Sequence, residues 1–185
     1  MAARLRLALT LGLLLASVSA ARAQIGLYAM GSVGFLGSAN IAGAQADQNK
    51  SFSAFGGTFG IYDQMVKLGP MKFGADGRFF AQSGNNGGVG NKMHGGFGGL
   101  RLALQTGLFP VKPYIQAEVG GVSTNYGVET SNSTSFAYQV QGGLDFTLVP
   151  HLDARAEYGG GQINSVYSGQ RQTLQQVGFG LVVRF

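Results

Sequence analysis

The C-terminal stretch, residues 175–185, constrains the fold more than any other segment of the chain. It reads QQVGFGLVVRF, and every second residue counted back from the end is apolar: Val177, Phe179, Leu181, Val183 and Phe185. This period of two predicts a β-strand with one apolar face. An apolar strand at a bare sheet edge invites aggregation, so the pattern favours a closed barrel in which the last strand pairs with the first.

An alternating terminal strand that ends in phenylalanine resembles the assembly signal of Gram-negative outer-membrane β-barrels. The resemblance implies that the barrel-insertion machinery recognises the five apolar residues of this strand. The alternative is an ordinary strand of a soluble β-sandwich that happens to end the chain. These eleven residues leave both interpretations open, so the rest of the sequence has to decide between them.

The N-terminus has the layout of a secretory signal peptide. Two arginines precede an apolar run, and small residues follow it. Residues 21–23, Ala-Arg-Ala, fit the A-x-A cleavage pattern, which predicts a signal peptide at residues 1–23 and a mature domain at residues 24–185. Cleavage after Ala20 is the alternative. A membrane anchor would need about 20 apolar residues, and this run is shorter, so the sequence predicts export.

Composition excludes several classes of protein. Without residues 1–23, 10 basic residues face 8 acidic ones and the formal charge falls from +5 to +2, so no basic nucleic-acid surface is supported. The absence of cysteine excludes disulfides, thiolate metal sites and lipoprotein attachment. The chain has 32 glycines, 13 phenylalanines and 7 tyrosines, and no later apolar run is long enough for a transmembrane helix. We therefore expect a fold made of strands.

Eight alternating segments predict an all-β fold, an eight-stranded antiparallel up-and-down transmembrane barrel. The predicted strands span residues 24–36, 53–62, 71–82, 96–105, 114–121, 136–148, 152–160 and 172–185. The predicted connections alternate strictly between long and short; residues 83–95 form one of the long ones, and all four prolines fall in the short set. Short periplasmic turns and longer extracellular loops are typical of transmembrane barrels.

One face of the predicted strands carries ten charged residues, and the opposite face carries none. The ten are Lys72, Asp76, Arg78, Arg101, Glu118, Asp145, Asp153, Arg155, Glu157 and Arg184. A lipocalin-like soluble barrel would also alternate, with its apolar face turned inward. Five positive and five negative charges among many glycines are better explained as the interior of a narrow barrel, where every buried ion needs a partner. The apolar face then meets lipid, with Phe and Tyr as its girdles.

The strand phases also predict the height of these charges in the barrel. We expect Lys72, Asp145, Asp153 and Arg184 near the periplasmic end, and the other six near mid-height. An eight-stranded barrel has an interior just wide enough for its own side chains. Two layers of opposite charges in this space predict a plugged lumen without stable conductance.

The whole predicted mature chain resembles the small outer-membrane barrel family that includes the transmembrane domain of outer-membrane protein A and the opacity-type proteins. The phrases PYIQAEVGG and GGLDFTLVPHLDARAEYGGG are similar to the strand–turn–strand phrases of that family. The resemblance implies a monomer in the Gram-negative outer membrane, in contact with its lipid and lipopolysaccharide. No peptidoglycan-binding domain is expected, since the sequence stops at Phe185.

The sequence predicts no cofactor, no metal site and no catalytic site. His94 is expected in a long loop and His151 in a short turn at the other end of the barrel, so the two cannot share a metal. A lipid-modifying barrel enzyme would need a Ser/His/acid set. His94 has candidate neighbours in Ser83, Asp47 and Glu129, but nothing in the sequence fixes their geometry.

Three functional hypotheses follow from these predictions. The first is a structural or surface-interaction protein whose role lies in its extracellular loops, with a plugged lumen. The second is a small porin-like channel for ions or solutes, and the third, less favoured, is a lipid-modifying outer-membrane enzyme. The partner of the loops cannot be named from the sequence, because loops diverge most freely and carry recognition.

Overall fold

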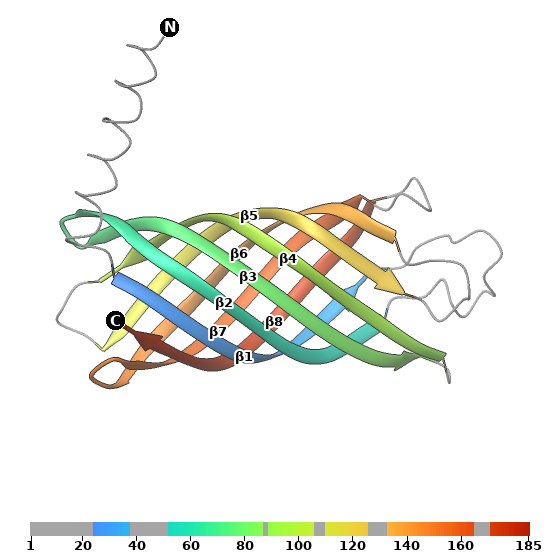
Figure 1. Cartoon of the computed structure of the whole chain (residues 1–185), viewed down its shortest axis with the longest axis horizontal. Coiled ribbons are helices and arrows are strands. Elements are labelled where there is room, and N and C mark those ends of the chain that lie inside the picture. The colour runs from blue at the N-terminus through green and yellow to red at the C-terminus, as the bar shows by residue number, and fades with distance from the viewer. Residues whose placement is uncertain (1–23, 38–51, 87–88, 106–109, 126–132, 165–170) are drawn as a thin grey trace, which may run out of the picture.

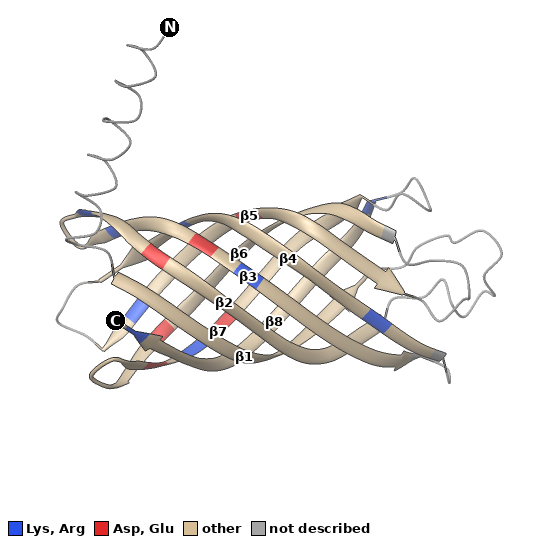
Figure 2. Cartoon of the chain, in the orientation of Figure 1, with Lys and Arg blue, Asp and Glu red and all other residues tan. Residues whose placement is uncertain are grey.

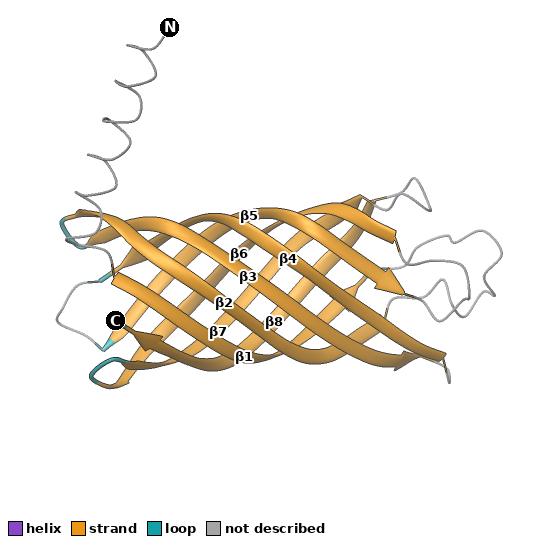
Figure 3. Cartoon of the chain, viewed as in Figure 1, coloured by secondary structure: helices purple, strands orange, loops and turns teal. Residues whose placement is uncertain are grey.

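The structure is a computed structural model that describes residues 24–37, 52–86, 89–105, 110–125, 133–164 and 171–185. Eight antiparallel strands form one closed barrel, in which each strand pairs with its neighbours in sequence and β1 pairs with β8 (Figures 1 and 3). The strands are β1 (Gln24–Leu36), β2 (Phe52–Leu68), β3 (Met71–Asn86), β4 (Val89–Leu104), β5 (Val111–Asn125), β6 (Ser133–Val149), β7 (Leu152–Asn164) and β8 (Arg171–Arg184). The predicted fold class is confirmed.

The predicted long connection at residues 83–95 is wrong. β3 and β4 continue through it as a ladder that runs from Ser83 opposite Lys92 to Asn86 opposite Val89, so only residues 87–88 lie between the two strands. The segment is rich in Gly and Asn, which are depleted in strands, but pairing and context override this preference. The connections therefore do not alternate strictly between long and short.

Both ends of the described chain lie at the same end of the barrel, which we call the turn end. The backbone N–H of Phe185 donates to the carbonyl oxygen of Ile25 at 2.9 Å, and the C-terminus is at the left of Figure 1. The short turns Gly69–Pro70 and Pro150–His151 lie at this end. His151 has a positive φ of 71°, and its Nδ1 lies 3.0 Å from the carbonyl oxygen of Arg184. The opposite end of the barrel is called the outer end.

Along most of the barrel the side chains alternate between an apolar exterior and a polar interior. Outward-facing Leu100, Phe55 and Phe179 are 75%, 67% and 66% exposed, whereas the inward-facing Arg101 is 2% exposed. The direction predicted from the charged residues is therefore confirmed: the apolar face is on the outside. Within the described residues, no helix is long and apolar enough to cross a membrane.

Near the outer end this polarity is reversed. Nine buried apolar side chains form an inward-facing cluster, the outer apolar layer: Leu36, Ala54, Phe80, Met93, Phe97, Val122, Ala137, Ile163 and Leu174. Polar residues join the exposed outward-facing set at the same end, namely Ser53, Ser83, Lys92, Thr134, Asn164, Arg171 and Thr173, beside the aromatic Phe35, Phe55 and Phe136. The exterior at this end is therefore mixed, while part of the interior is apolar.

Phe80, which breaks the alternation of β3, is explained by this layer. Its side chain is fully buried, and its ring stacks on that of Phe97 with a centroid distance of 5.9 Å. Offset stacking of this kind adds to the stabilisation that comes from burying the two rings. The residue is thus part of the interior packing near the outer end.

Candidate functional site

The ten predicted interior charges all belong to the inner surface, where they form three clusters. Figure 2 shows acidic and basic segments gathered mainly in the half of the barrel that carries the C-terminus. From mid-barrel toward the turn end, the three clusters differ in composition and in charge.

The central cluster places one arginine among three carboxylates. Arg78 Nε lies 3.0 Å from Glu118 Oε1 and 3.4 Å from Asp76 Oδ1. Both terminal nitrogens of Arg78 contact the Glu157 carboxylate, the longer contact being 3.3 Å, and Nη1 also donates to Gln141 Oε1. One cation and three carboxylates give this cluster a formal charge of −2.

Neutral side chains complete the hydrogen bonding of these carboxylates. Tyr28 donates to Asp76 Oδ1 and Tyr114 donates to Glu157 Oε2, each at 2.8 Å. Glu118 accepts from Gln116 Nε2 at 3.0 Å and from Gln139 Nε2 at 2.6 Å. Donors of this kind stabilise buried carboxylates that a single guanidinium cannot neutralise alone.

The lower cluster has the opposite ratio, with two arginines on one carboxylate. Asp145 Oδ1 lies 2.7 Å from Arg155 Nε, and its Oδ2 lies 2.8 Å from Arg155 Nη2 and 2.9 Å from Arg101 Nη2. Asp145 and Arg155 lie directly opposite each other in the β6–β7 ladder. Asp145 also lies opposite Lys112 in the β5–β6 ladder, so the lower cluster lies directly beside the turn-end cluster.

The turn-end cluster is built around Asp153. Its carboxylate lies 2.7 Å from Arg184 Nε and 3.0 Å from Lys112 Nζ. At the same end of the barrel, Lys72 of β3 donates to Gln24 Oε1 of β1 at 2.7 Å. Asp153, Arg184 and Lys72 thus lie at the end where they were predicted.

Lys112 is the charged interior residue that the sequence reasoning missed. The prediction placed it in a turn because Pro113 follows it, and proline usually marks the edge or the end of a strand. In the structure β5 begins at Val111, before this proline, and Pro113 pairs with Leu144 of β6 but has no partner in β4. Lys112 is in phase with Gln116 and Glu118, and this phase was the signal that could have identified it.

Three tyrosines form an aromatic layer over the arginines. The guanidinium carbon of Arg101 lies 3.5 Å from the ring centroid of Tyr114 and 4.4 Å from that of Tyr62, and Arg155 lies 4.3 Å from the ring of Tyr28. Cation–π contacts of this kind are strongest where water is excluded. The tyrosines therefore link the central and lower clusters into one network.

Each of these tyrosines lies opposite a glycine in its ladder. Tyr28 faces Gly60, Tyr62 faces Gly26, and Tyr114 faces Gly143. A Cβ on Gly26 would lie 2.6 Å from the Tyr62 hydroxyl oxygen, and the other two glycines leave equally little space. The glycines thus provide the room in which the rings lie beside the arginines.

Several buried polar atoms of this inner surface have no hydrogen-bond partner among the protein atoms described. They are Asp76 Oδ2, Gln82 Oε1, Arg101 Nε, Gln141 Nε2, Arg155 Nη1 and Gln176 Nε2. Buried polar groups without a protein partner are the places where internal water is usually bound. The interior is therefore suited to isolated water molecules between its side chains.

The five apolar residues predicted as the C-terminal assembly signal face outward, four of them in β8 and the fifth, Phe185, directly after it. Phe179, Leu181, Val183 and Phe185 are between 43% and 69% exposed, and Val177 is half-buried on the same face. β8 pairs with both β1 and β7, which closes the barrel as predicted. A recognition role of these five residues during assembly stays a prediction.

The two histidines lie at opposite ends of the barrel, as predicted, but His94 is a strand residue. It lies in β4 opposite Ala81, is exposed on the outer surface, and neighbours Ser83 and Lys92 on the same face. Of its other two candidate partners, Asp47 and Glu129, neither falls within the described residues. No group of three or more His, Cys, Asp or Glu suited to a metal ion occurs among the described residues.

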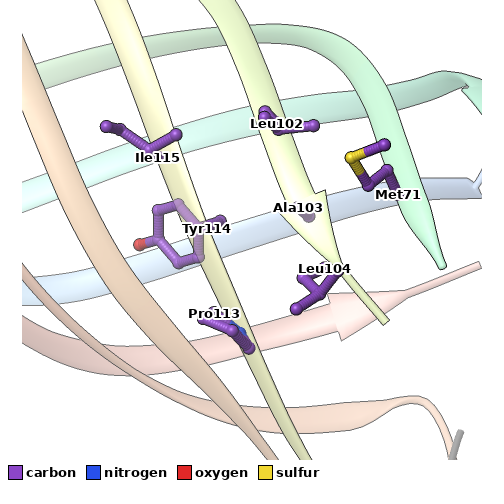
Figure 4. Close-up of a pocket in the computed structure, with 7 residues that line it drawn as sticks. All are labelled: Met71, Leu102, Ala103, Leu104, Pro113, Tyr114 and Ile115. Carbon is purple, nitrogen blue, oxygen red and sulfur yellow. The ribbon is translucent and has the colours of Figure 1, made fainter. Parts of the chain in front are cut away.

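The outer surface has shallow grooves between its apolar side chains. One of them, near the turn end, has a volume of about 330 Å³ and is formed by β3, β4 and β5 (Figure 4). Its lining residues are Met71, Leu102, Ala103, Leu104, Pro113, Tyr114 and Ile115. This lining is almost entirely apolar, so the groove suits a hydrocarbon chain and offers no set of catalytic groups.

Comparison with known proteins agrees with this architecture. The family model described as outer membrane protein beta-barrel domain matches residues 7–185. The chain is similar to the crystal structure of Neisserial surface protein A, with 18% identity, a TM-score of 0.60, and coverage of 88% of this chain and 97% of that chain. A comparison with curated protein sequences found no match.

Two further solved structures share the fold. One is Ail, the attachment invasion locus protein of Yersinia pestis, in complex with the heparin analogue sucrose octasulfate; it has 12% identity and a TM-score of 0.55, with 89% of this chain and 99% of that chain covered. The other is the outer membrane enzyme PagL, with 11% identity, a TM-score of 0.51, and 86% and 98% covered. At these identities the likeness shows the fold alone.

Proposed function

This chain belongs to the outer membrane β-barrel domain family and is located in the Gram-negative outer membrane, and from this premise we propose that it is a structural, surface-interacting barrel that does not conduct ions. Its partners in this proposal are the lipid and lipopolysaccharide around it, and the barrel-insertion machinery during assembly. The proposed unit is a monomer, since the barrel closes on itself through β1 and β8.

The observation that carries the proposal is the filling of the interior by two kinds of side chain. The three charge clusters occupy the half toward the turn end, and the other half holds the outer apolar layer, with Phe80 and Leu174 fully buried, together with buried neutral polar side chains such as Gln82. An ion that crosses the barrel would have to separate buried ion pairs and then enter an apolar layer, and both steps are costly.

The experiment that tests the proposal is a planar-bilayer recording. Wild-type protein should give no stable single-channel steps at neutral pH, while a known porin inserted under the same conditions gives them. Phe80→Ala combined with Phe97→Ala should also remain closed, because the charge clusters are intact in that variant. Steady, ion-selective steps from the wild type would overturn the proposal.

A porin-like channel is the second candidate, and the unpartnered interior atoms favour it. Asp76 Oδ2, Gln141 Nε2 and Gln176 Nε2 lie in the lumen without protein partners and could be linked by water. If the wild type conducts, the central cluster with its formal charge of −2 would be the selectivity lining. Arg78→Gln should then raise the preference for cations.

We propose no enzymatic role. His94 and Ser83 share the outer surface of β3 and β4, where a lipid-modifying enzyme would need them, so this pair is the one to test. His94→Ala should leave the acylation pattern of lipopolysaccharide unchanged when the protein is expressed in cells. A wild-type-dependent loss of an acyl chain that disappears in His94→Ala would establish an enzyme instead.

A further inference from the structure

The outer surface of β2, β3 and β4 carries a second groove, close to the outer end, with a volume of about 350 Å³. Its outward-facing lining residues are Phe55, Phe79, Ala81, Ser83, Lys92 and His94. The ladder places Ser83 opposite Lys92 and Ala81 opposite His94, and Phe79 lies one step nearer the turn end, opposite Gly96. Phe55 in turn lies opposite Ser83, so the groove has an aromatic side on β2 and β3 and a basic side on β4.

Small residues form the floor of the aromatic part. Ala81 lies opposite Gly57 of β2, and the rings of Phe55 and Phe79, 67% and 52% exposed, stand on either side of this pair. A channel with a floor of small residues and aromatic walls accommodates a linear apolar chain. Mostly apolar walls with a few polar groups are the usual composition of a small-molecule site.

The groove lies where the polarity of the barrel reverses. Phe79 belongs to the lipid-facing band, whereas Met93, between Lys92 and His94 in β4, is 1% exposed in the outer apolar layer. Lys92 and His94 thus lie at the level where the surroundings change from hydrocarbon to lipid headgroups. Long basic side chains at this level place their charge among the headgroups.

The charge of this surface selects for an anionic headgroup. Among the described outward-facing residues of β2, β3 and β4 near the outer end, Lys92 is a cation, His94 lies beside it, and none is a carboxylate. Lysine binds phosphate as a point charge, through charge-assisted hydrogen bonds. A phosphorylated lipid would satisfy both the aromatic and the basic part of the groove at once.

We propose that this groove binds lipopolysaccharide, with one acyl chain against Phe55 and Phe79 and a phosphate of its lipid anchor at Lys92 and His94. Lipopolysaccharide is the occupant because the outer end faces the leaflet whose main phosphorylated lipid it is. The inference rests on the surface-interaction role proposed above, but it does not depend on whether the lumen conducts.

Binding of purified lipid A to the detergent-solubilised full chain, measured by native mass spectrometry, tests the site. Lys92→Glu should weaken the binding of bisphosphorylated lipid A about tenfold or more, the effect of losing a charged hydrogen bond. Ala81→Phe should weaken it as well, because the ring fills the floor while both basic residues remain. Lys67→Glu, an exposed lysine at the turn end, is the matched control and should bind normally.

Two further comparisons make the result decisive. Dephosphorylated lipid A and phosphatidylglycerol should both bind at least about tenfold more weakly than bisphosphorylated lipid A. Equal binding of phosphatidylglycerol, or equal losses in Lys92→Glu and Lys67→Glu, would overturn the proposal. The gel shift between unheated and boiled samples confirms that each variant is folded, and bilayer recordings on the same samples test the lumen separately.

Discussion

Tyr114 of β5 lies directly opposite Gly143 of β6, and its ring occupies the space that a side chain at Gly143 would need. From this position the Tyr114 hydroxyl donates to Glu157 at 2.8 Å, and the ring lies 3.5 Å from the guanidinium carbon of Arg101. One glycine therefore allows one tyrosine to connect the central cluster with the lower cluster.

Gly143→Ala should destabilise the barrel through this tyrosine. The new Cβ would lie 2.5 Å from the Tyr114 hydroxyl oxygen, so the ring has to move away from Glu157 and Arg101. We expect a loss of about 1–3 kcal/mol in the free energy of unfolding, the usual range for overpacking. Gly142→Ala is the control, because its Cβ would lie 3.8 Å from the nearest atom, the carbonyl oxygen of Tyr114. Equal effects of the two substitutions in urea unfolding would contradict this account.

The central cluster has one cation for three carboxylates, whereas the lower cluster has two cations for one carboxylate. Neutralising a carboxylate should therefore lower the free energy of unfolding by different amounts in the two clusters. Asp145 contacts both Arg101 and Arg155, so Asp145→Asn leaves two buried guanidinium groups without their carboxylate and should cost about 3–5 kcal/mol. Glu118→Gln leaves Arg78 with Asp76 and Glu157, so its cost should be clearly smaller.

Full loss of the Glu118 carboxylate, as in Glu118→Ala, would cost about 3–5 kcal/mol if Glu118 formed a fully buried pair with one partner, and less if water reached it. The crowding of three carboxylates around Arg78 changes that expectation. Denaturant unfolding of Asp145→Asn and Glu118→Gln in the same detergent compares the two sites directly. A larger loss in Glu118→Gln than in Asp145→Asn would contradict the proposed balance of charges.

Phe185→Ser should impair assembly more than it impairs the finished barrel. Phe185 is 69% exposed and its backbone is already bonded to Ile25, so the ring contributes little to packing within the protein. Pulse-chase export assays should show the variant retained in the periplasm and degraded. Phe59→Ser, which removes a ring with 60% exposure from the lipid face of β2, is the control and should assemble. Normal barrel levels of Phe185→Ser would mean that the terminal residue is not the recognised element.

The strands in the membrane could be predicted because a barrel wall has only two environments. Met71, Phe73 and Phe79 face lipid while Asp76 and Arg78 face the interior, so the period of two is clear in the sequence and sets both the fold and the direction of the side chains. The same alternation predicts ten of the interior charges, and extended back past Pro113 it would also include Lys112.

Two properties of the site depend on relationships between strands, which a single sequence does not contain. The meeting of Arg101, Asp145 and Arg155 depends on the registers between strands, and these registers follow from the whole barrel rather than from local pattern. The outer apolar layer was missed because Leu36, Met93 and Leu174 lie on the face that is polar elsewhere in their strands. Where a barrel leaves the membrane the preferred direction of apolar side chains changes, and a uniform phase no longer describes the strand.

This reversal along β8 predicts which positions water can reach, and the absence of cysteine from the chain makes the test simple. Thr173→Cys and Gln175→Cys lie on exposed outward positions beside the outer apolar layer, whereas Leu181→Cys lies six or more residues further into the lipid-facing band. A membrane-impermeant maleimide added to intact cells should label Thr173→Cys strongly and Gln175→Cys at least partly, because both lie on the water side of the reversal. Leu181→Cys should remain unlabelled until the membrane is dissolved in detergent, because hydrocarbon excludes the reagent. Equal labelling of all three positions in intact cells would place the membrane boundary elsewhere, and absence of labelling at Thr173→Cys and Gln175→Cys until the cells are opened would invert the proposed orientation of the barrel.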